Sequence, residues 1–170
     1  MPLLETDRLV LRKLSVDDAE FILELVNEPS WLRFIGDKGV RTLDDARNYI
    51  LQGPIASYER FGFGLYLTEL KDSGIPIGIC GLVKREALEH ADIGFAFLPK
   101  FWGKGYAYES ASAVLGFAKD DLGLNRILAI TNPDNHSSIK LLEKVGMSFE
   151  ELVRFSETEE ELKLFAITLD

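Results

Sequence analysis

The chain has 170 residues, 46% of them hydrophobic and 28% charged, which is the size and composition of one soluble globular domain. Its formal net charge of −9 argues against a general nucleic-acid or anionic-membrane surface, because such surfaces need a positive field. One cysteine and two histidines offer no zinc-like spacing, so we expect no metal.

The location and the partners of the chain are predicted from the same counts. A single cysteine allows no intramolecular disulfide, which favours a reducing compartment such as the cytoplasm. No apolar stretch approaches the roughly 20 residues that span a bilayer, and the N-terminal segment has scattered charges instead of the apolar core of a targeting peptide. We therefore expect neither a membrane nor a nucleic acid as partner, and both a monomer and a homodimer remain open.

The first elements in chain order are one strand and two helices. Alternating apolar residues predict a strand over residues 8–14. Ser15 is a predicted helix N-cap, and the helix that follows it is expected to end at Pro29. Residues 30–41 then read as a loop, and a second helix follows until the Gly-Pro pair at 53–54 interrupts it.

The middle of the chain changes from helical to strand periodicity. Strands separated by polar turns are predicted at residues 61–70, 75–83 and 91–99. Three successive strands with short turns imply an antiparallel meander. A glycine-rich turn and a helix to about Lys119 come next.

The last third of the chain predicts a strand at 125–131, a short helix at 138–145, and a hairpin of two strands, 147–155 and 161–169, around an acidic turn. Strand–helix–strand units imply local parallel pairing. The fold class is therefore α/β: a single domain over residues 1–170, with a mixed, mostly antiparallel twisted sheet of about seven strands and about four helices.

The glycine-rich turn, PKFWGKGYAYES at residues 99–110, has the strand–turn–helix setting of a phosphate site. Its glycines, Gly103 and Gly105, allow close approach of the backbone, and the unpaired N–H groups of the first helical turn favour an anion. The spacing is neither the dinucleotide fingerprint, which has glycine where this chain has Tyr108, nor a P-loop. The turn alone leaves an anion site and a tight turn without ligand equally open.

The residues around this turn resemble the acyl-CoA signature of the GNAT superfamily of N-acetyltransferases. In that signature, Gln/Arg-x-x-Gly-x-Gly/Ala follows a strand and precedes a helix. Gly105 and Ala107 match it, whereas Trp102 stands where Gln or Arg is usual. The run W-G-K-G-Y-A is similar to the branch that contains the ribosomal-protein N-terminal acetyltransferases, the RimJ/RimL-like branch.

Two other segments extend the resemblance over almost the whole chain. LETDRLVLR at residues 4–12 is similar to the opening of that branch. NHSSIKLLEKVGM at residues 135–147 resembles its N-x-x-S-x-x-hydrophobic-x-E-K-x-G-F signature, from which only Met147 departs. Three motifs in the right order make the resemblance specific.

The resemblance implies an N-acetyltransferase with acetyl-CoA as co-substrate and an amine as acceptor, by direct transfer. The expected acceptor is a protein N-terminus. A small-molecule amine (amino acid, polyamine or antibiotic) and a non-catalytic acyl-CoA-binding domain remain alternatives. The strand at 91–99 is expected to splay from the strand at 125–131, so that the cofactor pairs with its free edge. The implied cofactor-binding residues are Phe95, Ala96, Phe97, Trp102, Gly103, Lys104, Gly105, Tyr106, Ala107, Tyr108, Asn135 and Ser138.

Direct transfer needs a base for the amine and a hydrogen-bond donor for the departing thiolate. In much of the superfamily a tyrosine of the last helix serves the thiolate, and its position here is Leu142. The usual tyrosine mechanism is therefore not available, and Ser138 is the replacement candidate. The alternative is that Asn135 and Ser138 only cap the helix.

For the base, Asp92 is the first candidate, because it starts the cofactor strand and can reach the acceptor through a water. The alternative is an ordinary surface residue of a strand. Glu69 and Glu89 are weaker candidates. Glu109 is expected to form a structural pair, and Cys80 is expected to belong to the core.

The acceptor pocket is expected between loop 30–41, helix 43–57 and turn 156–161. Several aromatic side chains are candidates to line it, although most such residues are core in proteins generally. These candidates are Trp31, Phe34, Phe61, Phe63 and Tyr106.

Overall fold

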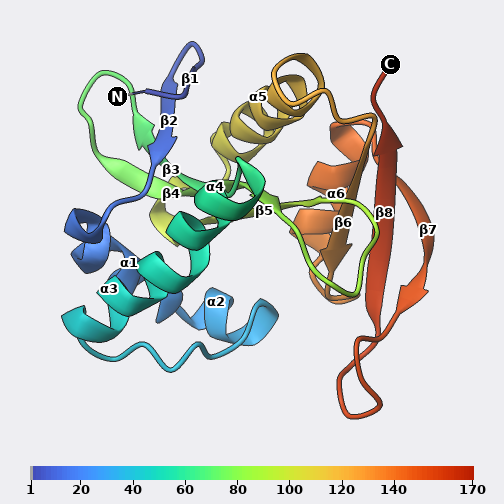
Figure 1. Ribbon diagram of the computed structural model, residues 1–170, viewed down its shortest axis with the longest axis horizontal. Helices are drawn as coiled ribbons and strands as arrows, with labels where there is room; N and C mark the ends of the chain where they lie inside the picture. Colours follow the sequence, from blue (N-terminus) through green and yellow to red (C-terminus); the bar gives the residue numbers. More distant parts are fainter. Residues whose placement is uncertain (1) are drawn as a thin grey trace.

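The computed structural model describes residues 2–170 and forms one eight-stranded sheet in the order β1-β2-β3-β4-β5-β6-β8-β7 (Figure 1). The strands are β1 (Leu4–Glu5), β2 (Leu9–Lys13), β3 (Leu65–Leu70), β4 (Pro76–Val83), β5 (Asp92–Phe97), β6 (Arg126–Thr131), β7 (Ser148–Val153) and β8 (Leu162–Thr168). The helices are α1 (Ala19–Val26), α2 (Pro29–Phe34), α3 (Leu43–Ile50), α4 (Ala56–Phe61), α5 (Tyr106–Asp120) and α6 (His136–Lys144).

The predicted fold class is confirmed, with one strand more than expected. All neighbouring strands are antiparallel except β5 and β6. The additional strand, β1, has only two residues and pairs with β2, where Leu4 faces Leu11. A segment so short has no periodicity of its own, so only its partner makes it a strand.

Two hydrophobic layers cover the two faces of β2–β5. On one face α5 packs against these strands through Ala111, Val114 and Ala118. On the other face α1 and α3 pack through residues such as Ile22 and Ile50. Figure 1 shows α5 and the α1–α4 group on opposite sides of the sheet.

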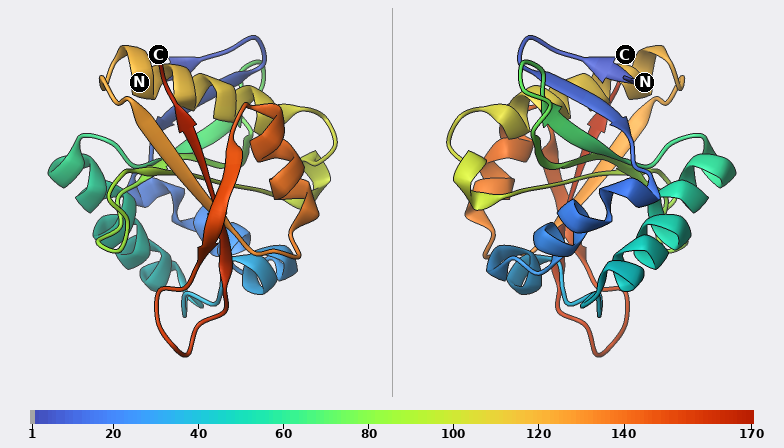
Figure 2. Two further views of the ribbon diagram at one scale, coloured as in Figure 1. Left: turned by 90° about the vertical axis from the view of Figure 1, so that its right-hand side faces the viewer. Right: turned by 90° about the vertical axis from the view of Figure 1, so that its left-hand side faces the viewer.

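The sheet opens between β5 and β6. Asp92 and Leu128 are the one residue pair that joins these parallel strands, and the Leu128 N–H donates to the Ala91 carbonyl (2.9 Å). Local parallel pairing is thus confirmed here. It does not extend to β7, because β8 lies between β6 and β7. The turn between β7 and β8 projects from the body of the molecule (Figure 2).

The helical region departs from the predicted boundaries at both prolines. The first helix, α1, ends at Val26, before Pro29 as predicted, but the loop expected at 30–41 is wrong in its first part: Pro29 begins α2, since the first helical position needs no N–H donor. Pro54 lies within a π-helical turn, Leu51–Ile55, that joins α3 to α4, so the predicted interruption is wrong. The widened turn accommodates the missing N–H and the proline ring. The predicted strand at 61–70 consequently begins only at Leu65.

Among residues 2–170, none of the helices has the length and apolar character needed to cross a bilayer.

Candidate functional site

The open side of β5 presents backbone groups to the gap between β5 and β6. The Leu98 N–H donates to the Ile77 carbonyl (2.9 Å), which fixes the alternation of the ladder with β4. By that alternation Ala96 directs its N–H and C=O toward β4. Phe95 and Phe97 direct theirs toward the gap, where they are positioned to pair with an extended ligand.

The side chain of Trp102 closes the end of this edge. Its Nε1–H donates to the Phe97 carbonyl (2.8 Å), while 54% of the residue's surface stays exposed. The residue that departs from the usual Gln or Arg therefore occupies one backbone acceptor of β5. The N–H and C=O of Phe95 and the N–H of Phe97 are left for a ligand.

The glycine-rich turn forms a row of unpaired donors between β5 and α5. Gly103 and Gly105 have φ values of +73° and +84°, a left-handed conformation that glycine adopts without steric cost. Gly105 is the N-cap of α5 and has no side chain to cap it. No backbone N–H of residues 103–108 donates to an acceptor within residues 2–170. Such a row at a helix N-terminus suits an anion.

Thr6 and Arg8 of the N-terminal segment contact this turn and the start of α5. The Arg8 guanidinium pairs with Glu109 (Nε to Oε1, 2.7 Å), donates to the Lys104 carbonyl (2.9 Å) and lies 4.4 Å from the centre of the Tyr106 ring. The Thr6 hydroxyl and the Arg8 N–H also donate to Glu109. The predicted structural pairing of Glu109 is confirmed. The role of Arg8 was missed, although the LETDRL motif that contains it was recognised.

The ionisation of Glu109 reflects these contacts. Burial opposes its charge, but the hydrogen bonds from Thr6 and Arg8 outweigh that effect and lower the pKa of Glu109. A cavity of about 550 Å³ adjoins the network. It is lined by Thr6, Asp7, Arg8, Gly105, Tyr108, Glu109 and Ser112.

Asp92 lies where β5 and β6 part, and only 1% of its surface is exposed. The alternative of an ordinary surface residue is therefore wrong. Burial raises the pKa of Asp92 to about 6, against the opposing effect of Arg85, whose Nε lies 3.1 Å from Oδ1. Sequence reasoning missed Arg85. The signal was the β4–β5 hairpin, which pairs Val83 with Asp92 and places Arg85 just beyond that pair.

At the N-terminus of α6, Asn135 and Ser138 have different roles in the helix cap. The Asn135 side chain accepts the Ser138 N–H (3.3 Å) and is the N-cap, so this half of the capping interpretation is confirmed. The Ser138 hydroxyl is not the cap acceptor. The usual tyrosine position is Leu142, which has no hydroxyl. This residue is 2% exposed and packs in the main core.

The remaining titratable candidates have other surroundings. Glu69 lies 3.4 Å from Arg12 in an ion pair, and Glu89 is exposed. Cys80 is fully buried in the core, as predicted, and burial raises the pKa of its thiol to about 12. Among residues 2–170, no cluster of three or more His, Cys, Asp or Glu side chains is arranged to hold a metal.

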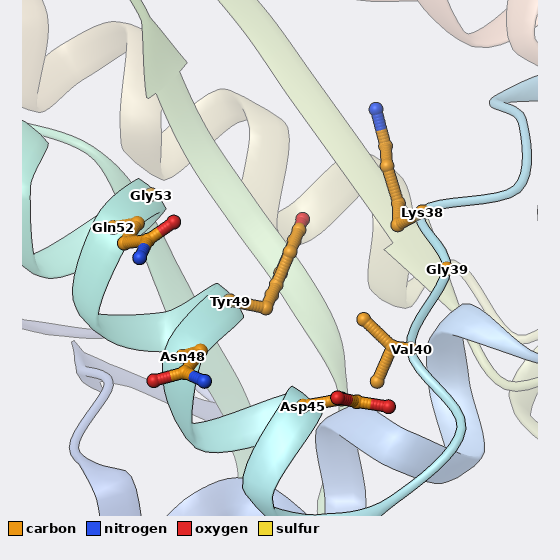
Figure 3. A pocket seen from close by; sticks show the side chains of 8 residues that line it. All are labelled: Lys38, Gly39, Val40, Asp45, Asn48, Tyr49, Gln52 and Gly53. Carbon is orange, nitrogen blue, oxygen red and sulfur yellow. The ribbon is translucent and has the colours of Figure 1, made fainter.

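A second cavity, of about 400 Å³, lies between α3 and the loop before it. Figure 3 shows Lys38 and Tyr49 extending from opposite walls into the same space, above the sheet. Burial raises the pKa of Tyr49. The lining residues are Lys38, Gly39, Val40, Asp45, Asn48, Tyr49, Gln52 and Gly53.

This cavity lies between two of the three segments expected to shape an acceptor pocket, and turn 156–161 does not line it. None of the five aromatic candidates lines it either. Trp31 and Phe63 are buried in the two main cores. Tyr49 was missed, because helical spacing alone does not show which side of α3 faces the loop.

The comparison with known families shows which family the chain belongs to. Residues 8–148 match the model of the acetyltransferase (GNAT) domain. The chain belongs to the GNAT family. The predicted enzyme class is confirmed: the chain is an N-acetyltransferase.

Individual relatives agree with this family. The uncharacterized N-acetyltransferase YoaA of Bacillus subtilis is 32% identical, over 90% of this chain and 86% of its own length. A GNAT-family acetyltransferase structure from Bacillus anthracis is 28% identical with a TM-score of 0.80, covering 96% of both chains. RimL, a ribosomal L7/L12 α-N-protein acetyltransferase solved with coenzyme A, has a TM-score of 0.84. It covers 100% of this chain and 99% of its own, at 18% identity, so it shows the shared GNAT fold alone.

Proposed function

We propose that the chain transfers the acetyl group of acetyl-CoA directly to a primary amine. The observation that carries this proposal is the order of two features: the open edge of β5 is followed, after a 3-10 turn at Pro99–Phe101, by the unpaired N–H groups of residues 103–108. One extended ligand with amides at one end and a pyrophosphate at the other matches that sequence of donors and acceptors. Both halves of the sheet border the gap, so we propose that residues 1–170 act as one domain.

The residues present fit acetyl-CoA. In the proposal, the pyrophosphate accepts hydrogen bonds from the N–H groups of residues 103–108, and the Lys104 ammonium adds positive charge. The pantetheine amides pair with Phe95 and Phe97, whereas Ala96 contributes contact without hydrogen bonds. Asn135 uses its side-chain oxygen for the α6 cap, which leaves its NH₂ group for the cofactor.

Asp92 is the proposed base. An amine acceptor is an ammonium ion in neutral water and must lose a proton before it attacks the thioester. A carboxyl with a pKa of about 6 is ionised at pH 7 yet is more basic than an ordinary aspartate. Because Asp92 is almost fully buried at the apex of the gap, a water relays the proton between the amine and this carboxylate.

Ser138 is the proposed donor to the departing thiolate. It lies in the first turn of α6, and its hydroxyl is not used as the helix cap. A hydroxyl at this position replaces the tyrosine that Leu142 excludes. The two proposed groups therefore act from different strand–helix units, Asp92 from β5 and Ser138 from α6.

For the acceptor we propose a protein N-terminus, as the WGKGYA and NHSSIKLLEKVGM motifs of the RimJ/RimL-like branch suggest. A small-molecule amine is the second candidate. The cavity beside α3 favours it, because about 400 Å³ with a lysine and a tyrosine suits a compact polar molecule.

A steady-state assay of thiol release from acetyl-CoA tests the proposal with a panel of amines. The panel contains peptides with free N-termini, the same peptides blocked at the N-terminus, amino acids, polyamines and aminoglycosides. Release with free but not blocked peptides supports the N-terminal acceptor, and release only with small amines supports the second candidate. Binding of CoA without turnover across the whole panel would overturn the transfer reaction.

A further inference from the structure

The Arg8 guanidinium contacts three residues in the second half of the glycine-rich segment 99–110. Arg8 contacts Lys104 through its carbonyl, Tyr106 through its ring and Glu109 through its carboxylate. A Cβ added to Gly105 would lie only 3.3 Å from Arg8 Nη2, so the guanidinium packs directly against this glycine. Arg8 belongs to no part of the proposed chemistry, and its motif has no assigned function.

These contacts orient one peptide plane. The Lys104–Gly105 peptide bond is trans and planar, so its C=O and N–H point in opposite directions. Arg8 Nη1 donates to the Lys104 carbonyl (2.9 Å), which turns this oxygen toward the N-terminal segment. The Gly105 N–H must then point to the other side, and it has no acceptor within residues 2–170.

We infer that Arg8 is a positioning residue that presets the Gly105 N–H, and with it the row of donors at the start of α5, toward the pyrophosphate of acetyl-CoA. This inference rests on the proposed use of acetyl-CoA. Without Arg8 the 104–105 peptide is free to rotate about ψ of Lys104 and φ of Gly105, because glycine tolerates a wide range of φ. A donor row that is already oriented saves the cost of ordering it on binding.

The role of Arg8 is orientation rather than direct charge attraction. Its charge is already paired with Glu109, at 2.7 Å, and Glu109 is held by Thr6 as well. The planar guanidinium spans Glu109 and Lys104 at once, through Nε and Nη1. A lysine has one ammonium group and cannot make both contacts in this geometry, so it should not replace Arg8.

The test compares two acetyl donors, acetyl-CoA and S-acetylpantetheine, which lacks the pyrophosphate. The variants are R8A and R8K, and the matched control is R154A. Arg154 is an arginine of similar exposure (47% against 45% for the side chains) whose partner Glu161 lies 3.6 Å away, far along the chain from the turn. Calorimetry gives the Kd for acetyl-CoA, steady-state kinetics give kcat/KM for both donors, and thermal unfolding shows that each variant is folded.

We expect R8A and R8K to raise the Kd for acetyl-CoA by about tenfold, the effect of losing one charge-assisted hydrogen bond. The kcat/KM with S-acetylpantetheine should change by less than about twofold, and R154A should leave both donors unaffected. An equal loss of kcat/KM with both donors would show that Arg8 only stabilises the fold, and would overturn the inference. So would unchanged affinity in R8A, or full rescue in R8K. A wild-type chain that binds no acetyl-CoA would instead overturn the proposed function itself.

Discussion

At the scale of single residues, Asp92 carries the strongest prediction because its environment is so unlike that of a surface carboxylate. Burial raises its pKa to about 6, so the carboxylate that accepts a proton is lost as pH falls through 6 rather than through 4. The kcat/KM of the wild-type chain should therefore fall about tenfold per pH unit below pH 6.

The D92N variant should lose about 100-fold or more of kcat and show no such acidic limb, since the amide does not titrate. Glu89 offers a matched control three residues away, because it is exposed in the loop before β5. The E89Q variant should keep both the rate and the pH profile of the wild type. An acidic limb that survives in D92N would assign the titration to another group.

The two polar residues of α6 make separable predictions. N135A removes the cap acceptor and should lower the free energy of unfolding by about 1 kcal/mol. S138A keeps the Ser138 N–H that donates to the cap, so its stability should match the wild type. Its kcat should nevertheless fall, since the thiolate loses a donor. Chemical denaturation and steady-state kinetics on both variants distinguish the roles; a destabilised S138A with unchanged kcat would reverse the assignment.

At the scale of elements, one glycine in the turn before α5 and one within α5 should respond oppositely to substitution. Gly105 has a φ of +84° and borders Arg8, so G105V should cost about 1–2 kcal/mol in backbone strain. It should also abolish the rise in melting temperature that acetyl-CoA gives the wild type. Gly116 lies inside α5 with nothing within 4 Å of an added Cβ, so G116A should stabilise by up to about 1 kcal/mol. Thermal unfolding with and without acetyl-CoA measures both; ligand stabilisation that persists in G105V would contradict the proposed pyrophosphate site at residues 103–108.

The elements also show where sequence reasoning reached its limit. Short apolar runs separated by polar turns predicted the meander of β3, β4 and β5, because these strands are largely covered on both faces and their burial does not alternate. The helix that begins at Pro29 and the helical path through Pro54 were not predicted, because proline breaks a helix only in its α-helical interior, and neither residue occupies one. Whether a proline starts or interrupts a helix depends on packing that local sequence does not contain.

The same limit applies to the site. Backbone contacts around Gly105 followed from a motif, since glycine spacing reports backbone geometry. Arg85 and Tyr49 were missed, because each reaches its place through tertiary contacts: a hairpin brings Arg85 to Asp92, and the packing of α3 turns Tyr49 toward the loop. Side-chain partners far apart in sequence are set by the fold and not by local periodicity.

At the scale of the whole molecule, the sheet consists of two halves that share one backbone bridge. Within residues 2–170, the strands β1–β5 and the strands β6, β8 and β7 are joined in the sheet by one ladder pair, Asp92 and Leu128. If acetyl-CoA fills the gap as an additional strand, it replaces water on the open edge of β5 with hydrogen bonds of its own. Ligand binding should then protect particular amides and not the strand uniformly.

Hydrogen–deuterium exchange followed by NMR resolves this pattern residue by residue. The amides of Phe95 and Phe97 should exchange fast in the free chain and slow by about tenfold or more with saturating CoA. The Ala96 amide lies between them and faces β4, so its exchange should be slow already and change far less. Ala96 is thus an internal control within the same strand. Equal protection of all three amides would indicate general stabilisation of the fold, and would contradict pairing of the cofactor with the open edge.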